Sequence, residues 1–211
     1  MRTILLFLFL FVTVSNLLIG QTDSVACTEN CAIKEGIYLT YQDFRWQKEI
    51  SKEKVVSKLD KSAIDFYSKM MRMEKIQFNG ESIPLEVLTE KIWGFCQNNA
   101  LYLNYRGEFY RVPLFGSISY LPATVEVISP AYYTPGYGMY GSTRTNEIRS
   151  FLMNINDGVI VPYSQSTAED LISRDVELYK EFKLLKRKKQ KEQVSRFIRK
   201  FNERNPVYFY K

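Results

Sequence analysis

The stretch Ile92–Val112, IWGFCQNNALYLNYRGEFYRV, predicts three short antiparallel strands joined by two tight turns. The turns are assigned to Asn98-Asn99 and Arg106-Gly107, which have residue types that tolerate the left-handed backbone of two-residue hairpins. Residues that lie directly opposite each other share a face of the sheet. The turns set the following opposite pairs: Cys96 and Leu101, Leu103 and Tyr110, and Leu101 and Val112.

This register gives the sheet two faces, and both of them are apolar or aromatic. The predicted core face holds Ile92, Cys96, Leu101, Leu103, Tyr105, Tyr110 and Val112. The second face holds Trp93, Phe95, Tyr102, Asn104, Phe109 and Arg111, so Trp93 and Leu103 are predicted on opposite sides. An antiparallel sheet with one wet face alternates apolar and polar residues. The second face therefore needs a cover.

Two interpretations of the second face remain open. The favoured one is internal burial, in which the helical C-terminal tail lies across the sheet, as helices do in α+β folds. The alternative is an open or barrel-lined pocket for an apolar ligand or a peptide, with Arg111 as its polar contact. A one-residue slip would exchange the two faces.

The N-terminus has the pattern of a secretory signal peptide. Arg2 precedes an apolar run, and small Gly20 is followed by Gln21, where we expect cleavage. The alternative is an uncleaved membrane anchor, but the run from Ile4 to Ile19 is slightly shorter than a spanning helix of roughly 17–25 residues. We expect the mature protein in the periplasm, the cell envelope or the extracellular space.

Export places the three cysteines in a compartment that permits disulfides. Cys27 and Cys31 could close a small loop, or either could link the N-terminal segment to Cys96 in the sheet. The pairing is open, and one thiol is left over. Structural zinc usually takes four Cys or His ligands, and this chain has no histidine, so we expect neither a metal site nor another cofactor.

The basic residues are concentrated at the C-terminus. From Leu171 to Lys211 there are 13 basic and 5 acidic residues, whereas Gln21–Asp170 has 15 basic and 18 acidic residues. A weak contact with an anionic surface is one interpretation, and a solvated charged helix is the other. The residues concerned are Lys183, Lys186, Arg187, Lys188, Lys189 and Lys191. No aromatic residue lies between Phe182 and Phe197 to stack bases, so we expect no nucleic-acid partner.

The fold class expected is α+β: an antiparallel β-meander, or a partly closed barrel-like sheet, with a helical, basic C-terminal tail. The signal peptide is 1–20, the sheet domain 21–165 and the tail 166–211. Within the sheet domain, apolar spacing suggests a helix near 51–73, and Asn79-Gly80 and Asp157-Gly158 predict hairpins. Thr40 and Asp43 have the spacing of a helix capping box, and so do Ser166 and Glu169 in the tail.

The apolar stripes of the tail face nearly opposite ways, so either the helix breaks around KRKKQK or its halves rest on different surfaces. The stretch near 129–146 is rich in Tyr, Gly and Pro and is predicted to be a loop. Tyrosine beside glycine suits an adaptable contact surface, although surface filler is the simpler interpretation. The candidate contact residues are Tyr132, Tyr133, Tyr137 and Tyr140.

No catalytic motif indicates an enzyme. The chain lacks a GxSxG elbow, an HExxH pair and a phosphate-binding glycine loop, and it has no histidine to act as a base. We therefore expect a non-catalytic envelope protein that binds or scaffolds. The first alternative is a carrier of an apolar ligand with a barrel-like pocket. The second is a hydrolase of envelope polymers, which would need two carboxylates about 5–10 Å apart in a cleft.

The chain resembles an uncharacterised family of exported proteins from Gram-negative bacteria, a domain of unknown function. The matching pieces are GIYLTYQDF, IWGFCQNNALYLNYRGEFYRV, GSISY, DVELYKEFKLLKRKK and FNERNP, which are spread over most of the mature chain. The resemblance implies secretion to the cell envelope and an α+β fold. It implies no activity and no catalytic residues.

Overall fold

The computed structural model describes residues 24–27, 33–80, 84–134 and 138–210. The predicted signal peptide and its cleavage point lie outside the described residues. Within the described part of the chain, no helix is long and apolar enough to span a membrane. The fold is α+β with antiparallel sheets and C-terminal helices, as predicted, and the described strands form open sheets rather than a closed barrel.

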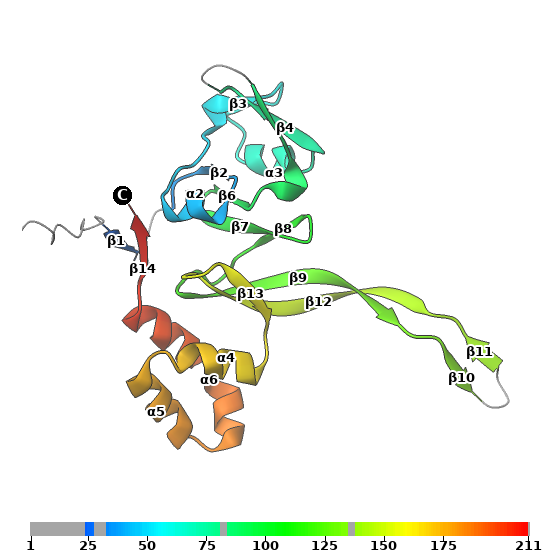
Figure 1. Cartoon of the computed structure of the whole chain (residues 1–211), viewed down its shortest axis with the longest axis vertical. Helices are drawn as coiled ribbons and strands as arrows, with labels where there is room; N and C mark the ends of the chain where they lie inside the picture. Colours follow the sequence, from blue (N-terminus) through cyan, green and yellow to red (C-terminus); the bar gives the residue numbers. More distant parts are fainter. Residues whose placement is uncertain (1–23, 28–32, 81–83, 135–137, 211) are drawn as a thin grey trace, which may run out of the picture.

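Four layers are stacked along the long axis of the molecule (Figure 1). A small sheet with one helix lies above a four-stranded sheet, which lies above a three-stranded sheet, which in turn rests on the C-terminal helices. Three hydrophobic clusters fill the spaces between successive layers. The clusters therefore cover both faces of the four-stranded sheet and both faces of that part of the three-stranded sheet that lies within the layers.

The four-stranded sheet has the predicted register. Its strands, in spatial order, are β2 (Gly36–Tyr38), β6 (Gly94–Gln97), β7 (Ala100–Tyr105) and β8 (Glu108–Arg111). Cys96 pairs with Leu101, and Leu103 pairs with Tyr110. The two turns have positive φ angles at Asn98, Asn99, Arg106 and Gly107, as two-residue hairpins of this hand require.

The predicted capping box at Thr40 is confirmed. The Thr40 hydroxyl accepts the backbone N–H of Asp43 at 3.0 Å, and the Asp43 carboxylate accepts the backbone N–H of Thr40 at 3.0 Å. These bonds satisfy N–H groups that a helix start otherwise leaves unpaired. They begin α2 (Tyr41–Arg45) directly after β2.

The predicted helix near 51–73 was wrong over most of its length. The segment instead forms η1 (Lys52–Lys54), β3 (Val55–Val56) and only a short α3 (Phe66–Met70). Between β3 and α3, the Asp60 carboxylate accepts the N–H of Ser62 at 2.8 Å, and the Ser57 hydroxyl accepts the N–H of Leu59 at 3.0 Å. Such local bonds compete with helical hydrogen bonding and override the apolar spacing.

The upper layer continues with a hairpin, as Asn79-Gly80 predicted. Strands β4 (Lys75–Phe78) and β5 (Leu85–Leu88) pair antiparallel, with β3 on the other side of β4. The 3-10 helix η2 (Thr89–Lys91) then leads back to β6.

The three-stranded sheet contains the longest strands of the protein. β9 (Ile118–Ser129) and β12 (Thr143–Asn154) pair over their full length of 12 residues each. β13 (Val159–Pro162) pairs only with the last four residues of β12, through the hairpin that Asp157-Gly158 predicted. β10 (Tyr132–Thr134) and β11 (Gly138–Tyr140) extend the same β9–β12 hairpin outward.

The C-terminal helices are α4 (Gln165–Ile172), α5 (Val176–Leu184) and α6 (Arg187–Arg204). The helix breaks at Leu185 and Lys186, which confirms one of the two predicted alternatives, and both apolar stripes then pack into one cluster with Ile118 and Leu152. The predicted cap at Ser166 was wrong. Ser164 caps α4, because its hydroxyl accepts the N–H of Thr167 at 3.1 Å.

The chain ends in β14 (Val207–Tyr210), which pairs with β1 (Ser24–Cys27). Arg45 of α2 anchors this end to the body. Its guanidinium donates to the carbonyl of Tyr208 at 3.0 Å and to the carbonyl of Ile155 at 2.8 Å, and it lies over the ring of Tyr210. The buried cation therefore joins three distant parts of the chain.

Candidate functional site

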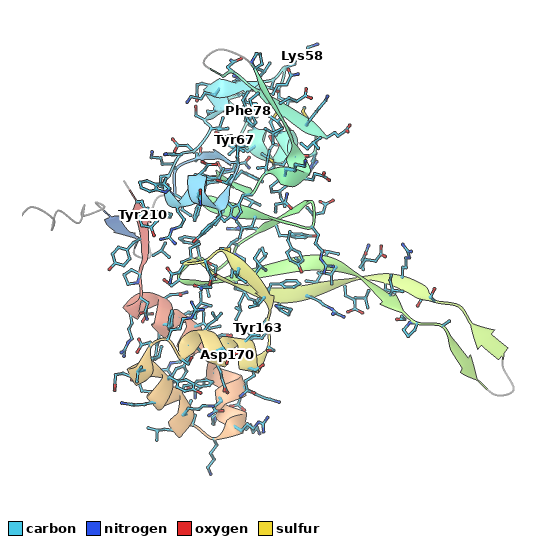
Figure 2. All side chains as sticks on the ribbon, in the orientation of Figure 1. Lys58, Tyr67, Phe78, Tyr163, Asp170 and Tyr210 are labelled. Carbon is cyan, nitrogen blue, oxygen red and sulfur yellow. The ribbon has the colours of Figure 1, made fainter. Side chains whose placement is uncertain are left out.

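The second face of the four-stranded sheet is internal core. Phe95 stacks on Tyr102 with ring centroids 4.6 Å apart, and Phe109 meets Phe95 edge-on at 5.5 Å. The residues that cover them come from α3 and the upper sheet: Phe66, Tyr67, Met70, Ile76 and Phe78. Figure 2 labels Tyr67 and Phe78 in this layer. The prediction that the C-terminal tail covers this face was wrong, because the tail lies two layers away.

Trp93 and Ile92 are exchanged relative to the predicted faces. Trp93 packs against the cluster that contains Leu103, with its ring 4.7 Å from that of Phe44, whereas Ile92 lies in the cluster of the second face. Trp93 and Leu103 are therefore on the same side, contrary to the prediction. The physical reason is that β6 begins only at Gly94, so strand alternation does not extend to the two residues that follow η2.

Arg111 is exposed on the outer strand β8 and lines an open groove of about 640 Å³. The groove runs between the end of β8 and the C-terminal end of α6, where Arg199 and Glu203 face it. Glu203 is the one acidic residue among its described lining residues. The groove therefore lacks the pair of carboxylates that a glycosidase mechanism would need.

The tyrosine-rich segment predicted as a loop is the end of a long hairpin. Tyr132 pairs with Tyr140 and Tyr133 with Met139, in the same register as the β9–β12 ladder behind them. Tyr137 lies outside the described residues. Of the described Gly and Pro residues that suggested a loop, Pro130 and Gly141 fall between the strand segments, whereas Gly138 begins β11. Sequence reasoning missed the hairpin, although the β-branched residues at Thr143, Thr145 and Ile148 are a strand signal.

We call the outer part of this hairpin, residues 124–134 and 138–148, the arm. The arm extends away from the layered body, with β10 and β11 at its end (Figure 1). In β12, residues 150–154 lie between two hydrophobic clusters, whereas residues 143–149 are all exposed. Ile148 is 80% exposed and Ile128 is 57% exposed. The outer half of the arm thus contributes almost nothing to the core.

The arm carries few interactions of its own beyond the ladder. Arg144 lies 3.4 Å from Glu126 across the ribbon, and Arg149 lies 3.2 Å from Glu147 along the same strand. Exposed ion pairs of this kind contribute roughly 0–1 kcal/mol each. An isolated two-stranded ribbon is only marginally stable in water. The arm is therefore an extended strand pair without a supporting layer.

A second groove, of about 710 Å³, lies at the base of the arm. It is bounded by the β7–β8 turn, by the β9 strand of the arm, by residues 149–151 of β12 and by the end of β13. Its aromatic and charged lining residues include Tyr105, Phe151, Tyr163, Arg106, Arg149 and Glu126. The groove contains one acidic residue among those described, Glu126.

The cysteine in the sheet is poorly suited to nucleophilic chemistry. Cys96 is free and fully buried in β6, and its thiol lies 3.6 Å from the carbonyl of Ile33. Burial raises the pKa of the Cys96 thiol to about 12. Because the thiolate is the reactive form, this thiol is unreactive near neutral pH. Because Cys96 is free, its predicted pairing with Cys27 or Cys31 is not present, and the Cys27–Cys31 pairing stays a prediction because Cys31 lies outside the described residues.

The predicted anionic-surface residues divide into two groups. Lys183 pairs with Glu169 at 2.9 Å, and Lys189 pairs with Glu192 at 3.1 Å. The Lys183 ammonium holds the pKa of Glu169 below its usual value. Among the described residues, no carboxylate lies within 4.0 Å of the other four cations, which are Lys186, Arg187, Lys188 and Lys191.

The described residues contain no group of three or more Cys, Asp or Glu side chains that could hold a metal ion. Comparisons of the chain with protein-family models, with curated proteins and with solved structures found no match. The family resemblance noted from the sequence therefore stays a prediction.

Proposed function

We propose that this protein is a non-catalytic, exported module of the cell envelope that binds or scaffolds a partner protein through its arm. The observation that carries the proposal is the exposed outer half of the β9–β12 ribbon, in which every described residue of 143–149 is exposed. Free sheet edges are sites where another chain can pair. The signal-peptide pattern supports the location of the proposed activity.

The two alternatives have weaker support. A carrier of an apolar ligand would need an empty apolar interior, but the space beside Phe95 and Tyr102 is filled by side chains of the upper layer. A hydrolase would need paired carboxylates, but each of the two described grooves contains a single acidic residue. The geometry therefore favours binding by the arm.

Photo-cross-linking from the arm tests the proposal. A photoreactive residue in place of Ile148 should capture a discrete envelope protein in cells. The matched control is the same residue in place of Ile64, which is 78% exposed compared with 80% for Ile148 but lies in the upper layer. A specific adduct from position 148 and none from position 64 is expected. No adduct from 148, or the same adduct from both positions, would contradict the proposal.

A second candidate function is contact with an anionic membrane surface at the corner between α5 and α6. Leu184 is 87% exposed beside Lys186 and Arg187, which have no carboxylate within 4.0 Å among the described residues. The first turn of α6 contains basic residues and no acid, and no side chain caps it. Cations at a helix N-terminus oppose the helix dipole, so they do not serve the stability of α6. An apolar side chain among cations suits the interface of an anionic bilayer.

A further inference from the structure

The direction of the backbone N–H and C=O groups along the outer edge of β12 can be deduced from one hydrogen bond. That bond joins β12 to Tyr163, the residue that follows β13. The carbonyl of Ser150 accepts the N–H of Tyr163 at 2.8 Å. In an antiparallel ladder the N–H and C=O of one residue point to the same side, and successive residues alternate. Ile148, Asn146 and Arg144 therefore direct both groups outward, where no described strand lies.

The outer edge of β9 is blocked where the arm joins the body, at Pro122 and Thr124, whereas the described residues provide no such block on the edge of β12. The N–H of Tyr120 donates to the carbonyl of Leu114 at 2.9 Å, which shows that even-numbered residues of β9 point outward. The next outward residue is Pro122, which has no N–H to offer an incoming strand. The carbonyl of the one after that, Thr124, accepts the hydroxyl of Tyr110 at 3.1 Å. Natural proteins block sheet edges with such devices.

The part of the chain that the structure describes provides no such block on the edge of β12. Residues 143–149, TRTNEIR, contain no proline. β13 stops at Pro162, so β12 loses its neighbour midway along its length. A strand that continued the line of β13 would pair with the outward groups of Ile148, Asn146 and Arg144.

The groove at the base of the arm begins where β13 ends. Pro162 and Tyr163 line it together with Val127, Phe151 and Tyr105. If a partner strand continued the line of β13 beyond Pro162, its first side chain on the groove's side of the sheet would lie over the groove. Pockets for alternate side chains give strand addition its specificity. The lining residues would favour an apolar side chain.

The charges in the groove favour an acidic residue beside that apolar one. Arg149 is paired with Glu147, and Glu126 is paired with Arg144. The Arg106 guanidinium lies 5.4 Å from the ring centroid of Tyr105, and no described carboxylate lies within 4.0 Å of it. Arg106 is thus the unpaired cation of the groove.

We infer that the partner adds an extended peptide strand to the outer edge of β12, with an apolar side chain in the groove and an acidic side chain at Arg106. The inference rests on the proposed function and specifies the chemistry of its partner. According to this inference, the partner strand binds to the outer edge of β12 and not to the outer edge of β9.

Selection from a library of random eight-residue peptides, displayed on phage, tests the inference with the full mature protein as bait. The variants are Asn146→Pro on β12 and Thr124→Pro on β9, because both residues direct their N–H outward and neither lines the groove. Each proline removes one outward N–H from its own edge and no bond from the ribbon. Selected peptides should contain an apolar and an acidic residue and should bind Asn146→Pro at least about tenfold more weakly. They should bind Thr124→Pro as they bind the wild type.

Arg106→Asn provides a second variant that does not touch the ribbon. Arg106 has a φ of 57° before Gly107, and Asn-Gly is the preferred pair in such a turn, so the fold should be retained. This variant should also lose peptide affinity. Equal binding to wild type and Asn146→Pro, or no enrichment of peptides at all, would overturn strand addition at β12. The proposed function would still stand if position 148 captured an envelope protein, so the two failures are distinguishable.

Discussion

The backbone N–H of Tyr163 donates to the carbonyl of Ser150, with 2.8 Å between nitrogen and oxygen. Beyond this bond, the described residues give β12 hydrogen-bond partners only on the β9 side. Figure 2 labels Tyr163 where the chain leaves the sheet toward α4. On the body side of Ser150, the β9–β12 ribbon has β13 as a neighbour, and on the outer side it has no neighbouring strand among the described residues. The arm begins at this point.

Removing the outer arm should leave the body folded. Replacing residues 128–144 by Asn-Gly joins Val127 to Thr145, which are opposite each other in the ladder and suit closure by a two-residue turn. None of the three hydrophobic clusters includes a described residue from the removed segment. The midpoint of thermal unfolding should stay within about 4 °C of the wild type, which corresponds to a change of about 1 kcal/mol. A much larger fall, followed by circular dichroism, would show that the arm stabilises the fold.

Cys96 should be protected from thiol reagents. In a variant with Cys27→Ser and Cys31→Ser, Cys96 is the only thiol, and burial raises its pKa to about 12. Alkylation by iodoacetamide at pH 8 should therefore be slow in the native protein and rapid in denaturant. Mass spectrometry of the alkylated protein measures both rates. Equal rates in the two conditions would mean that Cys96 is accessible.

The protein should lose stability in alkali. Burial raises the pKa of Tyr67 and that of Cys96 to about 12 each, and it also raises the pKa of Tyr38. Because the unfolded chain releases these protons first, at pKa values of about 8.5 for Cys and 10 for Tyr, the free energy of unfolding falls as pH rises from about 9 to 12. Urea unfolding at several pH values measures the fall. Tyr67→Phe should make the fall shallower, and an unchanged pH dependence in this variant would contradict the assignment.

Asp175 should stabilise the helical layer as the cap of α5. Its carboxylate accepts the N–H of Leu178 at 3.0 Å, which lowers the pKa of Asp175, and it lies 2.7 Å from Arg204 of α6. Asp175→Ala should reduce the free energy of unfolding by about 1–2 kcal/mol, and Asp175→Asn by less, because Asn also caps helices. In the wild type this contribution should be lost as pH falls below the ordinary pKa of aspartate, about 4. Equal effects of Ala and Asn in urea unfolding would exclude capping as the cause.

The corner between α5 and α6 should bind anionic vesicles if it contacts a membrane. Binding to phosphatidylglycerol vesicles should exceed binding to phosphatidylcholine vesicles and should weaken between about 50 mM and 500 mM salt, since salt screens exposed charges. Leu184→Ser should weaken it severalfold, whereas Ile64→Ser, at a similarly exposed isoleucine, should not. Vesicle sedimentation provides the measurement. Binding that does not change with salt concentration, or no binding at all, would contradict this second candidate function.

Turn signals and one capping signal in the sequence predicted local structure correctly, whereas the helix expected near 51–73 and the cap expected at Ser166 were wrong. The turns at Asn98-Asn99 and Arg106-Gly107 fixed the register of three strands, and the Thr40 capping box placed α2. These features depend on residues within a few positions of each other, so their physical cause is visible in the sequence. The α+β class followed from the same signals.

The sequence did not correctly predict which layer packs against which. The second face needed a cover, but the choice between the tail and the segment before β6 depends on contacts between distant residues, such as Tyr67 with Phe95. Trp93 was misplaced because the alternation was extended past the start of a strand. The arm was missed because Pro130 and Gly141, which sit between its strand segments, were interpreted as the marks of a loop.

Hydrogen exchange of individual backbone amides in the arm tests the central claim most directly. In the isolated protein, the outward amides of Asn146 and Ile148 should exchange rapidly, while the inward amides of Thr145 and Glu147 are protected by β9. On addition of the protein captured from position 148, the two outward amides should become protected. Outward amides that are already protected in the isolated protein, or that stay unprotected in the complex, would contradict the account of the arm as an open edge for a partner strand.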